Sequence, residues 1–225
     1  MQNQTADITW RPGDVPVSKR FDDPYFSLEN GLAETRHVFL RGNDLPARFA
    51  GGFHVAELGF GTGLNFLTTL AEWREADCGG ILEFTSFEAF PMRAEDMQTA
   101  LAVFPELVAD AGLLVSQWSP SGGLIEICPN VRLNVVIGDA RNEVQKWQGQ
   151  ADAWYLDGFS PAKNPELWSE KLMTDVARRT APGGTFATYT AAGFVRRGLE
   201  AAGFAVKRVP GYGRKRHMTR GALHS

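Results

Sequence analysis

Short apolar runs alternate with amphipathic stretches along most of the chain from residue 53 onward. The runs with the length and the aromatic and β-branched content of buried strands are FHVAEL (53–58), ILEFTSFE (81–88), ADAWYLD (151–157) and GGTFATYT (183–190). Stretches of helical period, such as NFLTTLAEWREA and MRAEDMQTALAVF, lie between them. Strands that alternate with helices indicate crossover connections, and therefore a largely parallel sheet with helices on both faces.

Two further segments have the pattern of hairpins. LIEIC and RLNVVIG flank a turn at Pro129-Asn130-Val131, and the second of these arms is expected to belong to the main sheet. FAVKRVPGYGRKRHMTRG contains two short strands that would close the sheet in antiparallel fashion. The sheet is therefore expected to be mixed at its ends.

The N-terminal 50 residues differ from the rest, with mixed polar and aromatic character and weak periodicity. They are expected to form a small hairpin and helix over one edge of the sheet. The predicted organisation is an extension over residues 1–50 and a main domain over 51–225. No apolar stretch approaches the roughly 20 residues of a membrane helix, and the N-terminus lacks a secretory signal, so a cytoplasmic location without membrane contact is expected.

Charge is distributed unevenly, although the net charge is only −3. Residues 196–225 contain eight Lys or Arg and one acid. This basic segment could bind a polyanion, because each Lys or Arg that neutralises a phosphate releases condensed counterions, or it could simply be a solvated tail. The two cysteines, Cys78 and Cys128, belong to no Cys-x-x-Cys or Cys/His cluster, so neither a disulfide framework nor a metal site is predicted.

A glycine-rich turn follows the first strand of the main domain. Gly59, Gly61 and Gly63 lie between strand and helix, where open α/β sheets bind nucleotides and where a missing Cβ lets a ligand approach the backbone. A dinucleotide fingerprint would need a glycine at position 64, which is leucine, and no P-loop Gly-Lys-Ser/Thr follows. The remaining pattern, Glu57-x-Gly-x-Gly-x-Gly, resembles the first motif of class I S-adenosylmethionine-dependent methyltransferases.

That resemblance implies S-adenosylmethionine as cofactor, with Glu57 and the loop backbone holding its methionyl part. Glu88 ends the next strand and could bind a ribose diol, and Asp139 could meet the adenine amino group. Either acid alone could instead be a helix N-cap. Together with the loop they give the expected cofactor-binding set: Glu57, Gly59, Phe60, Gly61, Gly63, Asn65, Glu88, Asp139 and Asp157.

Asp157 is the candidate catalytic residue. Strand ADAWYLD delivers it to the carboxyl edge of the sheet, beside the expected cofactor site. In amino-group methyltransferases this strand end often carries Asp or Asn, because the attacking nitrogen must be neutral and aimed along the methyl–sulfur axis. A carboxylate can accept a hydrogen bond from that amine, orient it and take its proton, although the proton could also leave to water.

The loop after Asp157 has a local and a functional interpretation. NPELW has the pattern of a helix start, with Asn164 as N-cap and Pro165 as first helical residue. That does not account for Phe159 and Lys163, which are expected at the mouth of the site, where a ring can stack on a base and a lysine can meet a phosphate.

Three segments together, ELGFGTGLNFL, DGFSPAKNPELW and GYGRKRHM, resemble the methyltransferase part of the MnmC/MnmD family, which modifies the wobble uridine of certain tRNAs. FDDPYFSLENGLAETRHVFLRGNDLPARF is similar as well, so the resemblance covers about residues 18–221. It implies a Rossmann-like class I methyltransferase fold, α/β, with a mostly parallel seven-stranded sheet. It also implies methyl transfer from S-adenosylmethionine to 5-aminomethyl-2-thiouridine, giving 5-methylaminomethyl-2-thiouridine.

Bifunctional members of that family continue into a flavin-dependent oxidoreductase, whereas this chain has no second nucleotide-binding loop. It is therefore expected to work without flavin or metal, as a stand-alone methyltransferase or an excised domain. The implied partner is tRNA, contacted at the anticodon stem-loop, with a functional link to the enzymes that install the aminomethyl group. The expected substrate contacts are Phe26, Phe159, Lys163, Tyr212, Arg214, Lys215 and Arg216, with Arg196 and Arg197 extending the basic track.

Alternatives remain at this point. Each aromatic candidate, Phe60 included, could serve packing alone. An aminopropyltransferase or a small-molecule N-methyltransferase would use a similar sheet and an acid after the same strand, but a polyamine enzyme would be expected to have a more acidic mouth. A non-catalytic RNA-binding protein could also keep this fold, although the intact glycine loop and Asp157 argue against it.

Overall fold

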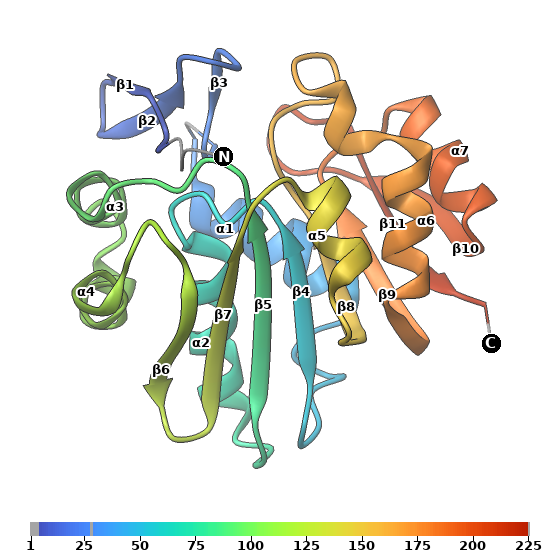
Figure 1. Ribbon diagram of the computed structural model, residues 1–225, viewed down its shortest axis with the longest axis horizontal. Helices are drawn as coiled ribbons and strands as arrows, with labels where there is room; N and C mark the ends of the chain where they lie inside the picture. The colour runs from blue at the N-terminus through green and yellow to red at the C-terminus, as the bar shows by residue number, and fades with distance from the viewer. Residues whose placement is uncertain (1–4, 28, 225) are drawn as a thin grey trace.

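The computed structural model describes residues 5–27 and 29–224, in which an eight-stranded sheet of order β10-β11-β9-β8-β4-β5-β7-β6 forms the centre (Figure 1). Residues 1–4, 28 and 225, which fall within the two expected domain ranges, lie outside the described residues. The strands of this sheet are His54–Leu58 (β4), Leu82–Glu88 (β5), Gly123–Cys128 (β6), Val131–Ile137 (β7), Ala151–Leu156 (β8), Thr180–Thr188 (β9), Phe204–Pro210 (β10) and His217–Leu223 (β11).

The central strands are parallel and the outer ones antiparallel. Parallel pairs join β7 to β5, β5 to β4, β4 to β8 and β8 to β9. Strands β10 and β11 pair with each other in antiparallel fashion, and β11 pairs with β9, so the antiparallel closure expected of the last segment is confirmed. The parallel arrangement brings the carboxyl ends of β4, β5, β7 and β8 to one edge of the sheet.

Helices cover both faces of the sheet. In Figure 1, α5, α6 and α7 lie in front of β4, β8, β9 and β11, while α1 and α2 lie behind. The α-helices are Gly31–Thr35 (α1), Leu64–Ala76 (α2), Ala94–Leu101 (α3), Val108–Gln117 (α4), Ala140–Lys146 (α5), Glu170–Arg178 (α6) and Gly193–Ala201 (α7). Shorter turns are a π-helical turn at Arg36–Leu40 (η1) and 3-10 turns at Arg41–Asn43 (η2), Pro105–Leu107 (η3) and Pro165–Trp168 (η4).

The two faces of the sheet bury separate apolar cores. One core packs Phe66, Phe84 and Tyr155 against the N-terminal segment and α2 to α4. The other packs Trp154 and Phe186 against α5, α6 and α7. Successive residues of a strand point to opposite faces, so the near-continuous apolar run ADAWYL supplies both cores, as expected of a strand buried on both sides.

The expected count of seven strands is wrong, because β6 adds an eighth strand at the edge next to β7. β6 pairs with β7 in antiparallel fashion from Gly123 to Cys128, so the two strands form the hairpin that was expected here. Ile125 and Ile127 are buried, and β6 contacts α4. The alternate residue Leu124 is 62% exposed. Burial of one face only is ordinary for an antiparallel strand at the edge of a sheet.

The N-terminal segment forms a small separate sheet followed by helical turns. Strands Ile8–Arg11 (β1), Val15–Ser18 (β2) and Asp23–Pro24 (β3) pair in antiparallel order, and α1, η1 and η2 follow. A hairpin and a helix were expected here. The domain boundary near residue 50 stays a prediction.

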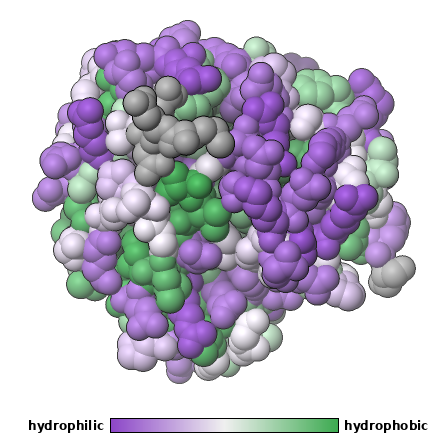
Figure 2. All heavy atoms as spheres, in the orientation of Figure 1, coloured by the Kyte–Doolittle hydropathy of each residue, from purple (hydrophilic) through white to green (hydrophobic). Residues whose placement is uncertain are grey.

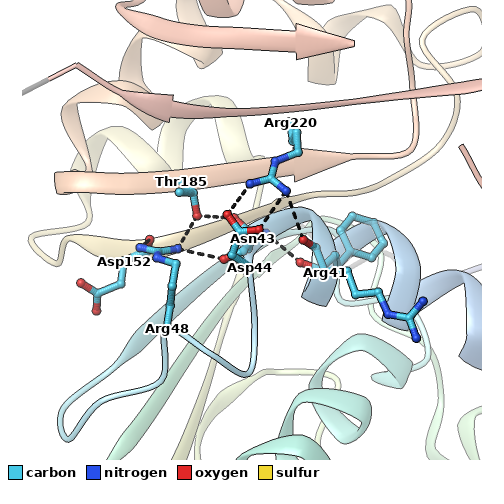
Figure 3. Close-up of polar contacts among 8 residues, drawn as sticks. Arg41, Asn43, Asp44, Arg48, Asp152, Thr185 and Arg220 are labelled. Atoms are coloured by element: carbon cyan, nitrogen blue, oxygen red, sulfur yellow. Dashed lines mark hydrogen bonds and ion pairs between the residues drawn. The ribbon is translucent and has the colours of Figure 1, made fainter. Parts of the chain in front are cut away.

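A buried polar network fastens the end of this segment to the large sheet (Figure 3). Asn43, which is fully buried, donates to the carbonyls of Phe39 and Trp154 and accepts from the hydroxyl of Thr185 at 2.6 Å. Arg48 donates to the carbonyls of Asn43 and Asp152 and to Thr185 Oγ1. Arg220 on β11 pairs with Asp44. Side chains from β9 and β11 thus hold residues 43–48 in place.

Replacing Asn43 with alanine is expected to lower the free energy of unfolding by about 2–4 kcal/mol, because it removes the donor to two backbone carbonyls and the acceptor of the buried Thr185 hydroxyl. Urea denaturation followed by circular dichroism would measure this. Gln98→Ala, at an exposed position of α3, is the control and should change stability by less than about 0.5 kcal/mol. Equal stabilities of the two variants would contradict an anchoring function of Asn43.

The outer surface differs between the two ends of the sheet. Hydrophilic residues dominate over α5, α6 and α7, whereas apolar residues gather on the side of β6 and β7 (Figure 2). Among the described residues, no helix is long and apolar enough to cross a membrane.

Candidate active site

A cavity of about 1190 Å³ opens at the carboxyl edge of the parallel strands. Its walls come from the glycine loop after β4, the ends of β5, β7 and β8, the N-terminal segment, and residues 212–215 between β10 and β11. The cavity exceeds the roughly 300–1,000 Å³ of a typical small-molecule site. It therefore has room for a cofactor and part of a second reactant.

The glycine loop has the backbone conformation that its sequence predicts. Gly59, Gly61 and Gly63 have φ of +83°, +56° and +82°, a region in which side chains are strained. A Cβ on Gly61 would lie 3.2 Å from the ring of Tyr25, which closes the cavity from the N-terminal side. Gly59 and Gly61 line the cavity, whereas Gly63 turns the chain into α2 and packs against Leu114.

Glu88 holds the loop from the neighbouring strand. Its two carboxylate oxygens accept hydrogen bonds from the backbone N–H groups of Gly61, at 2.9 Å, and Phe90, at 2.7 Å. Burial raises the pKa of the Glu88 carboxyl, and the backbone donors oppose that shift. Glu88 also lines the cavity, so the same carboxylate that shapes the glycine loop is available to a bound hydroxyl.

Glu57 lies behind the cavity wall and does not line it. It is fully buried, and its oxygens accept from Ser86 Oγ at 2.6 Å and from Asn65 Nδ2 at 2.8 Å. Burial raises the pKa of its carboxyl well above the usual value. The geometry favours an indirect function for Glu57, which is to orient Asn65, in place of the direct cofactor contact that was expected.

Asn65 connects the buried carboxylate to the cavity. Its Nδ2 also donates to Asp157 Oδ2 at 2.8 Å, and its Oδ1 accepts from the hydroxyl of Thr35 at 2.9 Å. The amide therefore has partners on three elements, the N-terminal helix α1 and the ends of β4 and β8. Such a chain of satisfied polar groups fixes the position of each member.

Asp157 occupies the wall of the cavity directly after β8, as predicted. Its Oδ1 accepts from the backbone N–H of Gly158 at 2.8 Å. Burial raises the pKa of Asp157 to about 6, against the opposing effects of the Gly158 N–H, the Asn65 amide and Lys215. At neutral pH the group is therefore mostly a carboxylate, and from the cavity wall it can accept a hydrogen bond from a ligand.

Asp139 lines the cavity but is engaged locally. It caps α5 by accepting from the N–H of Arg141, and its oxygens also accept from the Arg141 guanidinium. Those bonds lower the pKa of the Asp139 carboxyl. Arg141 lies 3.4 Å from Glu166 as well. The N-cap interpretation is therefore correct, and an adenine contact would need Asp139 to share its oxygens with Arg141.

The loop after Asp157 is fastened to the N-terminal segment. Phe159 lines the cavity and stacks on Phe21 with ring centres 4.6 Å apart, while Tyr25 meets its edge. Ser160 N donates to Asp23 Oδ2 at 2.8 Å. Lys163 donates to the carbonyl of Asp22 and does not line the cavity. Lys163 is thus tied to the N-terminal segment.

NPELW is not the start of the long helix. Pro165–Trp168 form the 3-10 turn η4, and Asn164 makes no side-chain capping bond. Helix α6 begins at Glu170, after Ser169. The Trp168 indole instead donates to the carbonyl of Phe159, so this turn braces the cavity loop. After this turn, α6 directs Leu172, Met173 and Val176 into the core beside Trp168, and all four side chains are buried.

Most of the other expected substrate contacts line the cavity, and Arg216 does not. Phe26 and Tyr212 line the cavity, and so does Phe60, although it is buried and stacked on Trp118. Arg214 and Lys215 also line it, paired with Glu29 and Glu34 at 2.8 Å each. Arg216 is exposed and does not line it.

Sequence reasoning missed several cavity residues. They are Phe21, Tyr25, Glu34, Thr35 and Tyr189. Tyr189 donates from its hydroxyl to the carbonyl of Gly158 at 2.8 Å. For the four that precede residue 50, the available signal was the mixture of aromatic and acidic residues in a segment of weak periodicity; Tyr189, after β9, had no such signal.

A family model described as S-adenosyl-L-methionine-dependent methyltransferase matches residues 109–224, just over half of the chain. The chain belongs to this methyltransferase family. Its cofactor is therefore S-adenosylmethionine, and its fold is the Rossmann-like α/β fold that was predicted.

Individual relatives agree with this assignment. The methyltransferase is 47% identical, over 96% of its length, to the "tRNA 5-methylaminomethyl-2-thiouridine biosynthesis bifunctional protein MnmC" of Aeromonas hydrophila. It spans only 35% of that relative's length. The crystal structure of MnmC2 from Aquifex aeolicus superposes with a TM-score of 0.75 at 25% identity, covering 99% of this chain and 72% of that one. Spermidine synthase from Thermotoga maritima, at 11% identity and TM-score 0.58, covering 97% of this chain and 67% of that one, shares the fold alone.

The residues of the methyltransferase fit this cofactor. The glycine loop leaves its backbone open because Gly59 and Gly61 have no Cβ, and Glu88 offers carboxylate oxygens suited to a diol. A carboxylate at position 157 suits a cationic group nearby. In the described ranges, no cluster of three or more His, Cys, Asp or Glu has the arrangement of a metal site.

Proposed function

We propose that this methyltransferase transfers a methyl group to the exocyclic amine of 5-aminomethyl-2-thiouridine at the wobble position of tRNA. The observation that carries the proposal is the 47% identity, over nearly the whole chain, to a protein named for the biosynthesis of 5-methylaminomethyl-2-thiouridine in tRNA. That name covers the formation of a methylated amine. An amine acceptor suits this cavity, because its wall presents the carboxylate of Asp157.

Asp157 is proposed to hold the acceptor nitrogen. When bound, S-adenosylmethionine supplies a sulfonium methyl, which passes to the amine lone pair while the carbon–sulfur electron pair stays on sulfur. Asp157 accepts an N–H of the amine and so directs the lone pair, and Asn65 and Gly158 keep the carboxylate in place. The proton shed after transfer leaves to solvent. The methyl donor is already activated, so positioning supplies most of the acceleration.

The cofactor is proposed to lie along the glycine loop, with Glu88 on its ribose and Asp139 near its adenine. The aromatic residues Phe26, Phe159 and Tyr212 then face the nucleoside, where stacking is the usual means of holding an unpaired base. Arg214 and Arg216 supply phosphate contacts for the anticodon stem-loop. We place this activity in the cytoplasm, in sequence with the enzymes that install the aminomethyl group.

The decisive experiment supplies the protein with S-adenosylmethionine and tRNA that carries 5-aminomethyl-2-thiouridine, followed by nucleoside mass spectrometry. The expected result is the gain of one methyl on that uridine. The matched control is the same tRNA without the aminomethyl group. Absence of the methylated nucleoside would overturn the proposal, and so would methylation of both tRNAs.

The pH dependence of kcat/KM should reflect Asp157. Because burial raises its pKa to about 6, the carboxylate takes up a proton as the pH falls through 6 and can no longer accept from the amine. The acceptor amine, like other alkylamines, takes up its proton at higher pH and already gives a slope of about one, so the logarithm of kcat/KM should fall with a slope that steepens from about one to about two below pH 6. Initial rates between pH 5 and 9, at constant ionic strength, would show this. A slope that stays at one would contradict it.

A further inference from the structure

Lys215 lies at the lip of the cavity, with its ammonium turned toward the acidic side of the site. Its Nζ is 2.8 Å from Glu34 Oε1 and 4.1 Å from the centre of the Tyr189 ring. The Glu34 side chain is only 12% exposed, so it holds Lys215 from the protein side. Tyr189 is bonded to the carbonyl of Gly158, next to Asp157. The ammonium therefore lies near the carboxylate that faces the acceptor.

The three adjacent basic residues point in different directions. Arg214 pairs with Glu29 but leaves 94% of its side chain exposed. Arg216 is exposed and away from the cavity. Lys215 is the member of the string whose charge acts on Asp157, where it lowers the carboxyl pKa. Arg214 and Arg216 are exposed enough to contact phosphates. Phosphate binding does not explain why Lys215 instead pairs with the largely buried Glu34.

The groups around Lys215 are mostly acidic. Glu34 on α1 pairs with its ammonium, Asp157 at the end of β8 interacts with its charge, and the ring of Tyr189 lies beside it. The charge of Asp23 on β3 acts on Tyr189. Burial, followed by Asp157, Asp23 and Glu34, raises the pKa of the Tyr189 hydroxyl. An amine that enters such surroundings is favoured as an ammonium ion, which has no lone pair for attack. A positive charge at the same place opposes that protonation.

We propose that the Lys215 ammonium, fixed by Glu34, keeps the acceptor amine in its neutral, nucleophilic form. The inference rests on the proposed function, because it assumes an amine acceptor beside Asp157. Lys215 offsets one carboxylate charge, so Asp157 can orient the amine without also holding it protonated. In the pair the Lys215 charge balances that of Glu34, and the more exposed Arg214 and Arg216 do not share this function.

Lys215→Met tests the proposal because methionine keeps the length of the side chain without its charge. With saturating tRNA and S-adenosylmethionine, the pH at half-maximal kcat should rise by about one unit, which lowers kcat at pH 7 by about tenfold and leaves the high-pH plateau unchanged. Lys215→Arg should restore the wild-type profile. Glu34→Gln combined with Lys215→Met should lie closer to wild type than Lys215→Met alone, because it removes both charges.

Arg214→Met is the matched control. It should raise KM for tRNA in a salt-dependent way without moving the pH midpoint of kcat. If Lys215→Met gave that same result, Lys215 would be a phosphate contact and the inference would be overturned, while methylation of the tRNA by the wild type would leave the proposed function intact.

A measurement without tRNA gives a second, independent readout. The Asp157 carboxyl can be titrated by carbon-13 NMR, with Asp157→Asn to assign its signal. Lys215→Met should raise the pKa of Asp157 above about 6 and Glu34→Gln should lower it. Unchanged titration in both variants would overturn the action of Lys215 on the site. If the wild type failed to methylate the tRNA, the proposed function would be wrong, and this titration alone would still support or overturn that action.

Discussion

Replacing Asp157 with asparagine is expected to lower kcat for methyl transfer by about 10²–10⁴-fold and to change the affinity for S-adenosylmethionine by less than about threefold. Asparagine has the shape of aspartate, but it has an NH₂ group in place of one carboxylate oxygen and can accept only at the other position. One of the two donors that the carboxylate satisfies, Asn65 Nδ2 or the Gly158 N–H, would face an NH₂ group. The acceptor amine would lose its negatively charged partner.

Single-turnover rates with the aminomethyl tRNA would measure the first effect, and isothermal titration of the cofactor the second. Asp152→Asn is the matched control, because Asp152 lies on the same strand at the end away from the cavity, where it accepts from His54 N. Its kcat should stay within about twofold of wild type. An Asp157→Asn rate near that of the control would show that Asp157 does not orient the amine.

Glu88→Gln is expected to weaken S-adenosylmethionine binding on the order of 100-fold, because it alters both the ligand contact and the loop that forms the site. Glu88 accepts backbone N–H groups at both oxygens. A glutamine must turn its NH₂ toward Gly61 or Phe90, and the repelled N–H group loses its partner in a buried place. The loop around Gly61 then loses the constraint that keeps its backbone open.

Titration calorimetry with the cofactor alone measures the effect, and thermal unfolding without cofactor shows whether the fold is retained. Glu83→Gln, five residues earlier on β5 and partly exposed, should bind the cofactor like wild type. The two variants should therefore differ in which property is lost: Glu88→Gln should lose cofactor affinity, and Asp157→Asn should lose methyl transfer. Normal cofactor affinity in Glu88→Gln would remove Glu88 from the cofactor site.

Much of this site could be predicted from sequence because parallel strands bring their carboxyl ends to one edge. An acid or glycine at the end of an apolar run is therefore placed at that edge by the run alone, as with Gly59, Glu88 and Asp157. Which way a side chain turns is a separate question. Glu57 ends the same kind of run, yet it points behind the wall to Ser86 and Asn65.

The sequence did not reveal which partners the basic residues of the site would have, because those partners are distant in the chain. Lys163 was expected at the mouth of the site, but its partner Asp22 is 141 residues away in sequence. Arg214 and Lys215 have acidic partners in the N-terminal segment. No local pattern reveals such pairs, because charge alone does not indicate which acid a lysine meets in the folded chain.

The contacts between the N-terminal segment and the last strands also bear on how the enzyme is made. Lys215 and Glu34 are 181 residues apart, and Arg220 and Asp44 are 176 apart. Contacts of such high sequence separation form late, because long loops must close first. During synthesis on the ribosome, the central strands can pair well before β11 emerges. The cavity has its complete wall only after residues 212–215 are released, so a partly made chain would contain the parallel strands and the glycine loop without a closed substrate site.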